Sequence, residues 1–311
     1  MRNFIFQLIL FSCVFFIYDK LFIIIANHSA EAEVDKRLEY LLKGEINKDI
    51  IIAGSSRGSR DIIAKQIQDK TGLTAYNLCY PGSNVDFHEF ILETLIRFNK
   101  PPKYVLLVVD DKAEFLCEES IVFRKDRLYP LIKYPYIWKK LAKLEDKDEI
   151  ISRLFILNRL NKYNFDLRKK KFTPLDTIMS CGSMPISWQR QGRKWMYNTN
   201  EHAYKIDNEE IVKINAYKKL VDIVRSNNIQ LVVIFPPNYQ KNCKEFEDRI
   251  KQLSGNGVYY YSFNDQNPIY RNKDYFYDES HLIRKGAVIF TDEVTDYLEK
   301  IINEKNNATK N

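Results

Sequence analysis

Short apolar stretches that alternate with helical patterns constrain the fold of this chain more than any other feature. Five of these stretches are rich in β-branched residues and end at turn residues, as buried strands do. They cover residues 49–53, 75–79, 104–109, 229–235 and 258–262. Helical patterns cover 58–70, 85–98, 209–227, 239–253 and 284–303. This alternation predicts an α/β protein, in which helices cover both faces of a parallel sheet of about five strands. In such proteins the functional groups lie at the carboxyl ends of the strands.

Two motifs near the ends of this pattern carry the candidate chemistry. The first predicted strand runs directly into Gly54-Ser55-Ser56-Arg57, and Asp278-Glu279-Ser280-His281 precedes the last predicted helix. A serine hydroxyl becomes a nucleophile when a base removes its proton, and that base needs a partner to fix its tautomer. Ser56, His281 and Asp278 fill these three roles. Each motif alone is common, but their placement agrees with a single site, so we predict a catalytic triad.

The same edge of the predicted sheet offers donors for a developing oxyanion, which acyl transfer also needs. The loop Tyr80-Pro81-Gly82-Ser83-Asn84 directly follows the second predicted strand. We predict an oxyanion hole formed by the amides of Ser56 and Gly82 and by the side chain of Asn84. Arg57 is a candidate for binding an anionic substrate, and it fits the surface of the following helix equally well.

The composition argues against several other kinds of site. Five scattered cysteines form no CxxC pair and four histidines are dispersed, so we predict no disulfide framework, no metal site and no cofactor. The net charge of +7 comes mostly from residues 161–200, which hold eight basic and two acidic residues. Such a segment can bind an anionic polymer or lipid headgroups, or it can be a solvated loop. No nucleic-acid motif accompanies it, and we predict no binding to nucleic acid. The eight basic residues are Lys162, Arg168, Lys169, Lys170, Lys171, Arg190, Arg193 and Lys194.

The segment 113–207 interrupts the alternation of strands and helices. An insertion of this length between two core strands predicts a lid or a binding subdomain rather than a simple connection. It is rich in aromatic residues, namely Tyr129, Tyr134, Tyr136, Trp138, Trp188, Trp195 and Tyr197.

The N-terminus is apolar almost without interruption from Phe4 to Ala26. As a helix this stretch would be roughly 34 Å long, which is enough to cross a bilayer. Asp19 and Lys20 lie late in it, where a charged pair avoids the middle of a membrane. We predict a retained anchor at 1–30 with the rest of the chain on the exported side, because Arg2 and the α-amino group precede the apolar run. A cleaved signal peptide stays open as the alternative.

These motifs, in this order, resemble those of the SGNH/GDSL hydrolases. Gly54-Ser55-Ser56, the Gly82 loop and Asp278-x-x-His281 correspond to the first, second and fifth conserved blocks of that superfamily. The resemblance implies a three-layer flavodoxin-like fold and serine-dependent acyl chemistry. Two departures stand out. Ser55 replaces the aspartate of the Gly-Asp-Ser form, and Val108-Val109-Asp110-Asp111 stands in place of the Gly-x-Asn-Asp block that supplies an oxyanion asparagine.

The layout with an N-terminal anchor is similar to a narrower group, the membrane-anchored SGNH-like proteins of surface-glycan O-acylation systems. This resemblance implies an esterase or O-acyl (acetyl) transferase that acts on a cell-surface glycan, with a membrane-bound O-acyltransferase as a possible partner. A non-catalytic subunit of an envelope polysaccharide complex is the alternative. The predicted domains are the anchor or signal at 1–30, a connector at 31–48, an SGNH-like domain at 49–303 with the insertion 113–207, and a disordered tail at 304–311.

Overall fold

The computed structural model describes residues 1–110, 112–117, 119–166, 168, 173–192, 196–198 and 204–308. They form two compact units. We call Met1–Glu39 with Arg124–Phe172 the N-terminal unit, and Tyr40–Phe123 with Thr173–Asn311 the sheet unit. These units do not follow the predicted domain boundaries, because 124–172 groups with the N-terminal residues and the rest of the insertion groups with the sheet.

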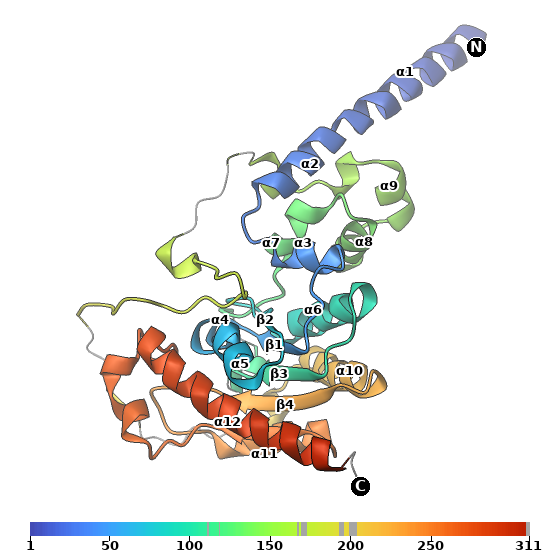
Figure 1. Ribbon diagram of the computed structural model, residues 1–311. Coiled ribbons are helices and arrows are strands. Elements are labelled where there is room, and N and C mark those ends of the chain that lie inside the picture. The colour runs from blue at the N-terminus through green and yellow to red at the C-terminus, as the bar shows by residue number, and fades with distance from the viewer. Residues whose placement is uncertain are drawn as a thin grey trace. The chain divides into compact units, whose positions relative to one another are not determined.

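The sheet unit is an α/β structure built on five parallel strands, as the alternation of patterns predicts (Figure 1). The strand order is β2-β1-β3-β4-β5. β1 therefore has β2 on one side and β3 on the other. The carboxyl ends of β1 and β3 form a topological switch point, which is where such sheets bind ligands. Each strand lies within two residues of its predicted bounds. The strands are β1 Ile50–Gly54, β2 Ala75–Asn77, β3 Tyr104–Val108, β4 Gln230–Phe235 and β5 Tyr259–Ser262.

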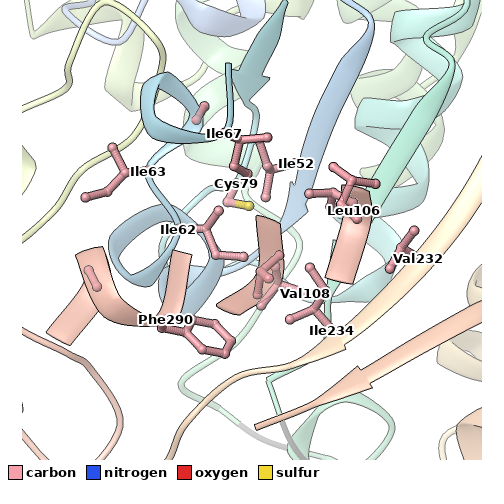
Figure 2. Packing of buried hydrophobic residues seen from close by; sticks show 14 of the residues in the cluster. Ile52, Ile62, Ile63, Ile67, Cys79, Leu106, Val108, Val232, Ile234 and Phe290 are labelled. Carbon is pink, nitrogen blue, oxygen red and sulfur yellow. The ribbon is translucent and has the colours of Figure 1, made fainter. Parts of the chain in front are cut away.

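Helices cover both faces of this sheet, which gives the three-layer architecture. On one face α12 packs against α4 and α5, and on the other α6 packs against α10. Alternate strand residues point to the first face, where Ile52, Leu106 and Val232 belong to a buried cluster that also contains Phe290 of α12 (Figure 2). The helices of the sheet unit are α4 Ser56–Asp61, α5 Ala64–Thr71, α6 Val85–Phe98, α10 Ile211–Ser226, α11 Lys244–Ser254 and α12 Arg284–Ala308.

Three helix predictions differ from the structure. The helix expected over 58–70 is two helices, because Ile62 and Ile63 adopt extended backbone and are buried. The helix expected from 239 begins at Lys244. Residues 304–308, expected in a disordered tail, continue α12, whereas 309–311 lie outside the described residues.

The N-terminal unit carries the apolar segment. Within the described residues, Arg2–Ala32 is the one stretch that is long and apolar enough to cross a membrane. Asp19 is buried at the end of α1, and its carboxylate accepts hydrogen bonds from the amides of Ile156 (2.8 Å) and Leu157 (2.9 Å). Asp19, which was predicted to avoid the membrane interior, thus binds two backbone amides of the insertion. The helices are α1 Arg2–Leu21, α2 Ile23–Ala32, α3 Arg37–Leu42, which crosses the unit boundary, α7 Lys125–Leu128, α8 Pro135–Leu144 and α9 Glu149–Leu154.

Short 3-10 helices complete the described structure. They are η1 Lys112–Glu114, η2 Tyr129–Leu131, η3 Leu157–Arg159, η4 Lys162–Phe165, η5 Pro174–Asp176, η6 Ile206–Asn208, η7 Pro268–Arg271 and η8 Lys273–Tyr275. Several residues named in the sequence analysis lie outside the described residues, namely Asp111, Lys169, Lys170, Lys171, Arg193, Lys194 and Trp195.

Candidate active site

Ser56 is placed by a sharp turn at the end of β1. Gly54 has a φ of +145°, and a Cβ atom there would lie 2.5 Å from the carbonyl oxygen of Val108 on the neighbouring strand, so only glycine fits. Ser55 follows as the N-cap of α4, and Ser56 is the first residue of that helix. The turn therefore lifts the Ser56 hydroxyl onto the carboxyl edge of the sheet, at the switch point between β1 and β3.

The structure brings the three residues of the predicted triad together. Ser56 Oγ lies 2.8 Å from His281 Nε2, and His281 Nδ1 lies 2.8 Å and 3.0 Å from the two carboxylate oxygens of Asp278. The amides of Ser280 and His281 also donate to Asp278 Oδ1, each at 2.9 Å. Burial raises the pKa of Asp278, but the hydrogen bond and charge of His281 and the two amides lower it more, and the net pKa is below 3.8. The carboxylate therefore stays ionised and holds the imidazole with Nε2 free to accept the serine proton.

Asp61, a residue that the sequence did not single out, positions the histidine loop. Its Oδ1 accepts a hydrogen bond of 2.9 Å from the amide of Leu282, directly after His281. Asp61 is fully buried, and burial raises its pKa well above the ordinary 3.8. The last residue of α4 thus ties the helix that carries Ser56 to the loop that carries His281.

Ser56 and His281 open into a cleft of about 340 Å³. Gly82 lines it, and its φ of +71° lies in the left-handed region that favours glycine. The amide of Ser56 donates to Ser55 Oγ at 2.5 Å. The lining residues are Ser56, Arg57, Arg60, Pro81, Gly82, Asp110, Ala113, Ser120, Ile121, Ser280 and His281.

The position of Asn84 does not agree with the prediction that its side chain contributes to the oxyanion hole. Among the described residues that line the cleft, Asn84 is absent. Its Oδ1 instead accepts from the Phe87 amide at 3.2 Å as the N-cap of α6, and its Nδ2 donates to Asp86 at 3.2 Å. Asparagine at this position is explained by helix capping.

Asp110 lies two residues after the end of β3, at the position where the resemblance noted in the sequence implies an oxyanion asparagine. Its Oδ2 accepts a hydrogen bond from the hydroxyl of Ser55, and its Oδ1 lies 3.4 Å from Arg57 Nε. Arg57 is therefore a buried ion-pair partner of Asp110 that also borders the cleft, rather than a free surface cation. In this arrangement Asp110 accepts a hydrogen bond and pairs with a cation, so it does not supply the donor that an asparagine would offer to an oxyanion.

The described residues offer no obvious metal centre. Among them, no group of three or more His, Cys, Asp or Glu side chains could hold a metal ion.

The fold and the site together define the class of protein: a parallel α/β sheet whose switch point carries a hydrogen-bonded Ser–His–Asp chain. No family model matches the sequence, and no curated protein matches it. Among solved structures, the chain is similar to the psychrotrophic esterase EstA from Pseudoalteromonas sp., in a structure inhibited by monoethylphosphonate. The two chains share 13% identity, over 82% of this chain and 99% of that one, with a TM-score of 0.40.

Proposed function

We propose that this chain is a serine-dependent esterase or O-acyltransferase of the SGNH/GDSL kind, with Ser56 as nucleophile. The observation that carries the proposal is the continuous hydrogen-bonded chain from Ser56 through His281 to Asp278, which opens into a cleft. Ser56 Oγ attacks the ester carbonyl while its proton passes to His281 Nε2. The protonated imidazole then gives that proton to the departing alkoxide as the ester C–O bond breaks, which leaves an acyl group on Ser56.

The second half of the reaction uses the same groups in reverse. His281 takes a proton from water, in an esterase, or from a sugar hydroxyl, in a transferase, and the resulting oxygen nucleophile attacks the acyl carbonyl. The bond between that carbonyl and Ser56 Oγ then breaks, and His281 returns the proton to Ser56 Oγ. The amide of Gly82, which lines the cleft, is the proposed donor to the oxyanion. The Ser56 amide, the other donor expected from the sequence, already donates to Ser55 Oγ.

The cellular setting in this proposal follows from the N-terminal segment. Arg2–Ala32 supports either an anchor or a signal sequence. In both cases the catalytic unit acts on the exported side, and a cell-surface glycan that carries O-acetyl groups is the proposed substrate. A membrane-bound O-acyltransferase is the proposed source or recipient of the acyl group.

The test is the reaction of Ser56 with a small ester and with a fluorophosphonate probe. The wild-type chain should hydrolyse 4-nitrophenyl acetate and be labelled by the probe, and Ser56→Ala should abolish both. Ser120→Ala, a second serine at the cleft, should still be labelled. Asp110 in place of the family asparagine favours one competing function, a non-catalytic subunit that keeps the fold. Absence of labelling in the wild-type chain would establish that competitor.

A further inference from the structure

A second arginine at the cleft is available for a ligand. Arg60 lies on α4 and lines the cleft together with Ser56 and His281. Its Nε is buried and has no hydrogen-bond partner among the described residues. A buried donor without a partner costs stability, and one that faces a cleft is explained when a ligand supplies the acceptor.

The two arginines that line the cleft differ in whether they have an ion-pair partner. Arg57 and Asp110 lie 3.4 Å apart, so their charges offset each other. In the part of the chain that the structure describes, no carboxylate forms an ion pair with the Arg60 guanidinium. The adjacent Asp61 is completely buried, which raises the pKa of its carboxyl and favours its neutral form. Of the two arginines that line the cleft, Arg60 is therefore the one without an ion-pair partner among the described residues.

We infer that Arg60 binds an acid group, a carboxylate or phosphate, that the substrate carries close to its ester. Ser56 and Arg60 are four residues apart on α4, so their side chains are neighbours on one face of the helix. A guanidinium donates two parallel hydrogen bonds to a carboxylate or a phosphate. The acid group must then lie within reach of the Arg60 guanidinium when the ester carbonyl is at Ser56. This inference rests on the proposed function. It narrows the substrate of the proposed enzyme to esters that carry an acid group close to the ester.

The experiment compares two esters that differ in one charge, 4-acetoxybenzoate and 4-acetoxybenzamide. For each variant the ratio of kcat/KM for the anionic ester to that for the neutral ester is measured. When this ratio is compared between variants, the intrinsic difference in reactivity between the two leaving groups cancels. In Arg60→Gln we expect the ratio to fall by roughly tenfold to a hundredfold, because one charge-assisted interaction is lost. Arg60→Lys should retain part of the preference, and added salt should weaken it in the wild type.

The control is Lys65→Gln on α5, which removes the same unit of charge outside the cleft. Its ratio should equal that of the wild type. An equal ratio in wild type and Arg60→Gln would overturn the inference. If the wild type turns over neither ester, the proposed function fails. Binding of 4-acetoxybenzoate to Ser56→Ala, with and without Arg60→Gln, then still decides whether Arg60 recognises the anion.

An independent observation concerns the N-terminal unit. Four large aliphatic side chains in and just after α9 are exposed: Ile150 at 70%, Ile151 at 48%, Leu154 at 48% and Leu157 at 41%. They lie beside the end of α1, because the ring of Phe155 packs against Phe15 (5.9 Å between centroids) and Phe16 (6.1 Å). This segment is also where the amides of Ile156 and Leu157 bind Asp19.

The geometry points to a lipid bilayer as the surface that covers these residues. Residues 2–18 form about 26 Å of helix before Asp19, close to the thickness of a bilayer's hydrocarbon core, so Phe15 and Phe16 fall near its edge. The exposed face of α9 then enters the boundary between acyl chains and headgroups, as an interfacial helix does. This inference rests on α1 as a retained anchor and not on the chemistry of Ser56.

The test is the depth of a spin label in nanodiscs that hold the full chain. The label is placed at Ile150→Cys or, as a control, at the exposed Asp222→Cys of α10, with Cys13, Cys117 and Cys243 replaced by serine. We expect oxygen to relax the Ile150 label more than a water-soluble nickel chelate does, and the opposite for Asp222. Equal access of the nickel chelate to both labels would overturn the inference.

Discussion

The sheet unit contains two chains of interacting side chains, each made of a serine, a histidine and a carboxylate. They differ in solvent exposure and in the group to which the serine hydroxyl donates its proton. In the first, Ser56, His281 and Asp278 border the cleft or connect to it. The second is Ser83–His88–Glu114, with Ser83 Oγ 2.9 Å from His88 Nε2 and His88 Nδ1 3.2 Å from Glu114. All three residues of this second chain are buried, at 0%, 2% and 2% exposure.

The difference lies in where each serine proton goes. Ser83 Oγ donates to the carbonyl of Tyr80 at 2.6 Å, so His88 Nε2 is the donor to Ser83 and does not act as its base. Ser56 Oγ has no such carbonyl among its hydrogen bonds in the described residues, and its proton is directed at His281. The same three residue types therefore form the proposed nucleophile in one place and hold a loop in the other. Because Ser83 follows Gly82, the buried chain holds the loop that is proposed to stabilise the oxyanion.

The largest expected contrast is between the two histidines. His281→Ala should lower kcat for 4-nitrophenyl acetate by about 10³-fold or more, because the base that activates Ser56 is lost. His88→Gln should lower the free energy of unfolding by about 1–3 kcal/mol through unsatisfied buried groups. Its kcat should change by less than about tenfold, since His88 does not contact the cleft. A comparable loss of kcat in both variants would show that the buried chain takes part in the chemistry.

Asp278→Asn should also lower kcat strongly, by about 10²-fold to 10⁴-fold, because the amide no longer fixes the tautomer that leaves Nε2 free to accept a proton. The corresponding change in the buried chain, Glu114→Gln, should have little effect on kcat. Steady-state kinetics at pH 7 measure both variants. A small effect of Asp278→Asn would mean that another group orients His281.

The strands, the triad and the glycine turns could be predicted from the sequence, because they depend on local patterns. β-branched runs that end at turns mark strands wherever they occur, and parallel topology then sends Gly54 and Gly82 to one edge. The roles that the sequence did not reveal depend on contacts between residues that are far apart in the chain. Arg57 and Arg60 look alike in the sequence, and only the position of Asp110 decides which of them is paired. Asn84 was misassigned because the same side chain suits a helix cap and an oxyanion hole.

The two carboxylates should show opposite dependences of stability on pH. The pKa of Asp278 is lowered, so its contribution to the free energy of unfolding is present above pH of about 3.8 and is lost as the pH falls further. The pKa of Glu114 is raised, by burial first and by the charge of Asp110, against the opposing effect of His88. Its contribution is therefore present below about 4.5 and declines as the pH rises above that value.

Urea unfolding from pH 3 to pH 7 checks this contrast. The stability advantage of the wild type over Asp278→Asn should shrink toward low pH, and its advantage over Glu114→Gln should shrink toward neutral pH. Each variant is the control for the other, because both replace a carboxylate by an amide of similar size. Parallel trends for the two variants would contradict the assigned difference in ionisation.

The smallest effect is expected from Ser83→Ala, which removes one hydroxyl from the buried chain. The Tyr80 carbonyl and His88 Nε2 each lose a buried hydrogen-bond partner, so the free energy of unfolding should fall by about 1–3 kcal/mol. If the hydroxyl acts through the Gly82 loop, kcat should fall by a few-fold while KM stays constant, because the oxyanion exists only beyond the ground state. Ser83→Thr keeps the hydroxyl and should recover part of kcat. A loss of stability with unchanged kcat would instead show that Ser83 contributes only to the stability of the fold. The buried set of residues would then have no effect on the chemistry at Ser56.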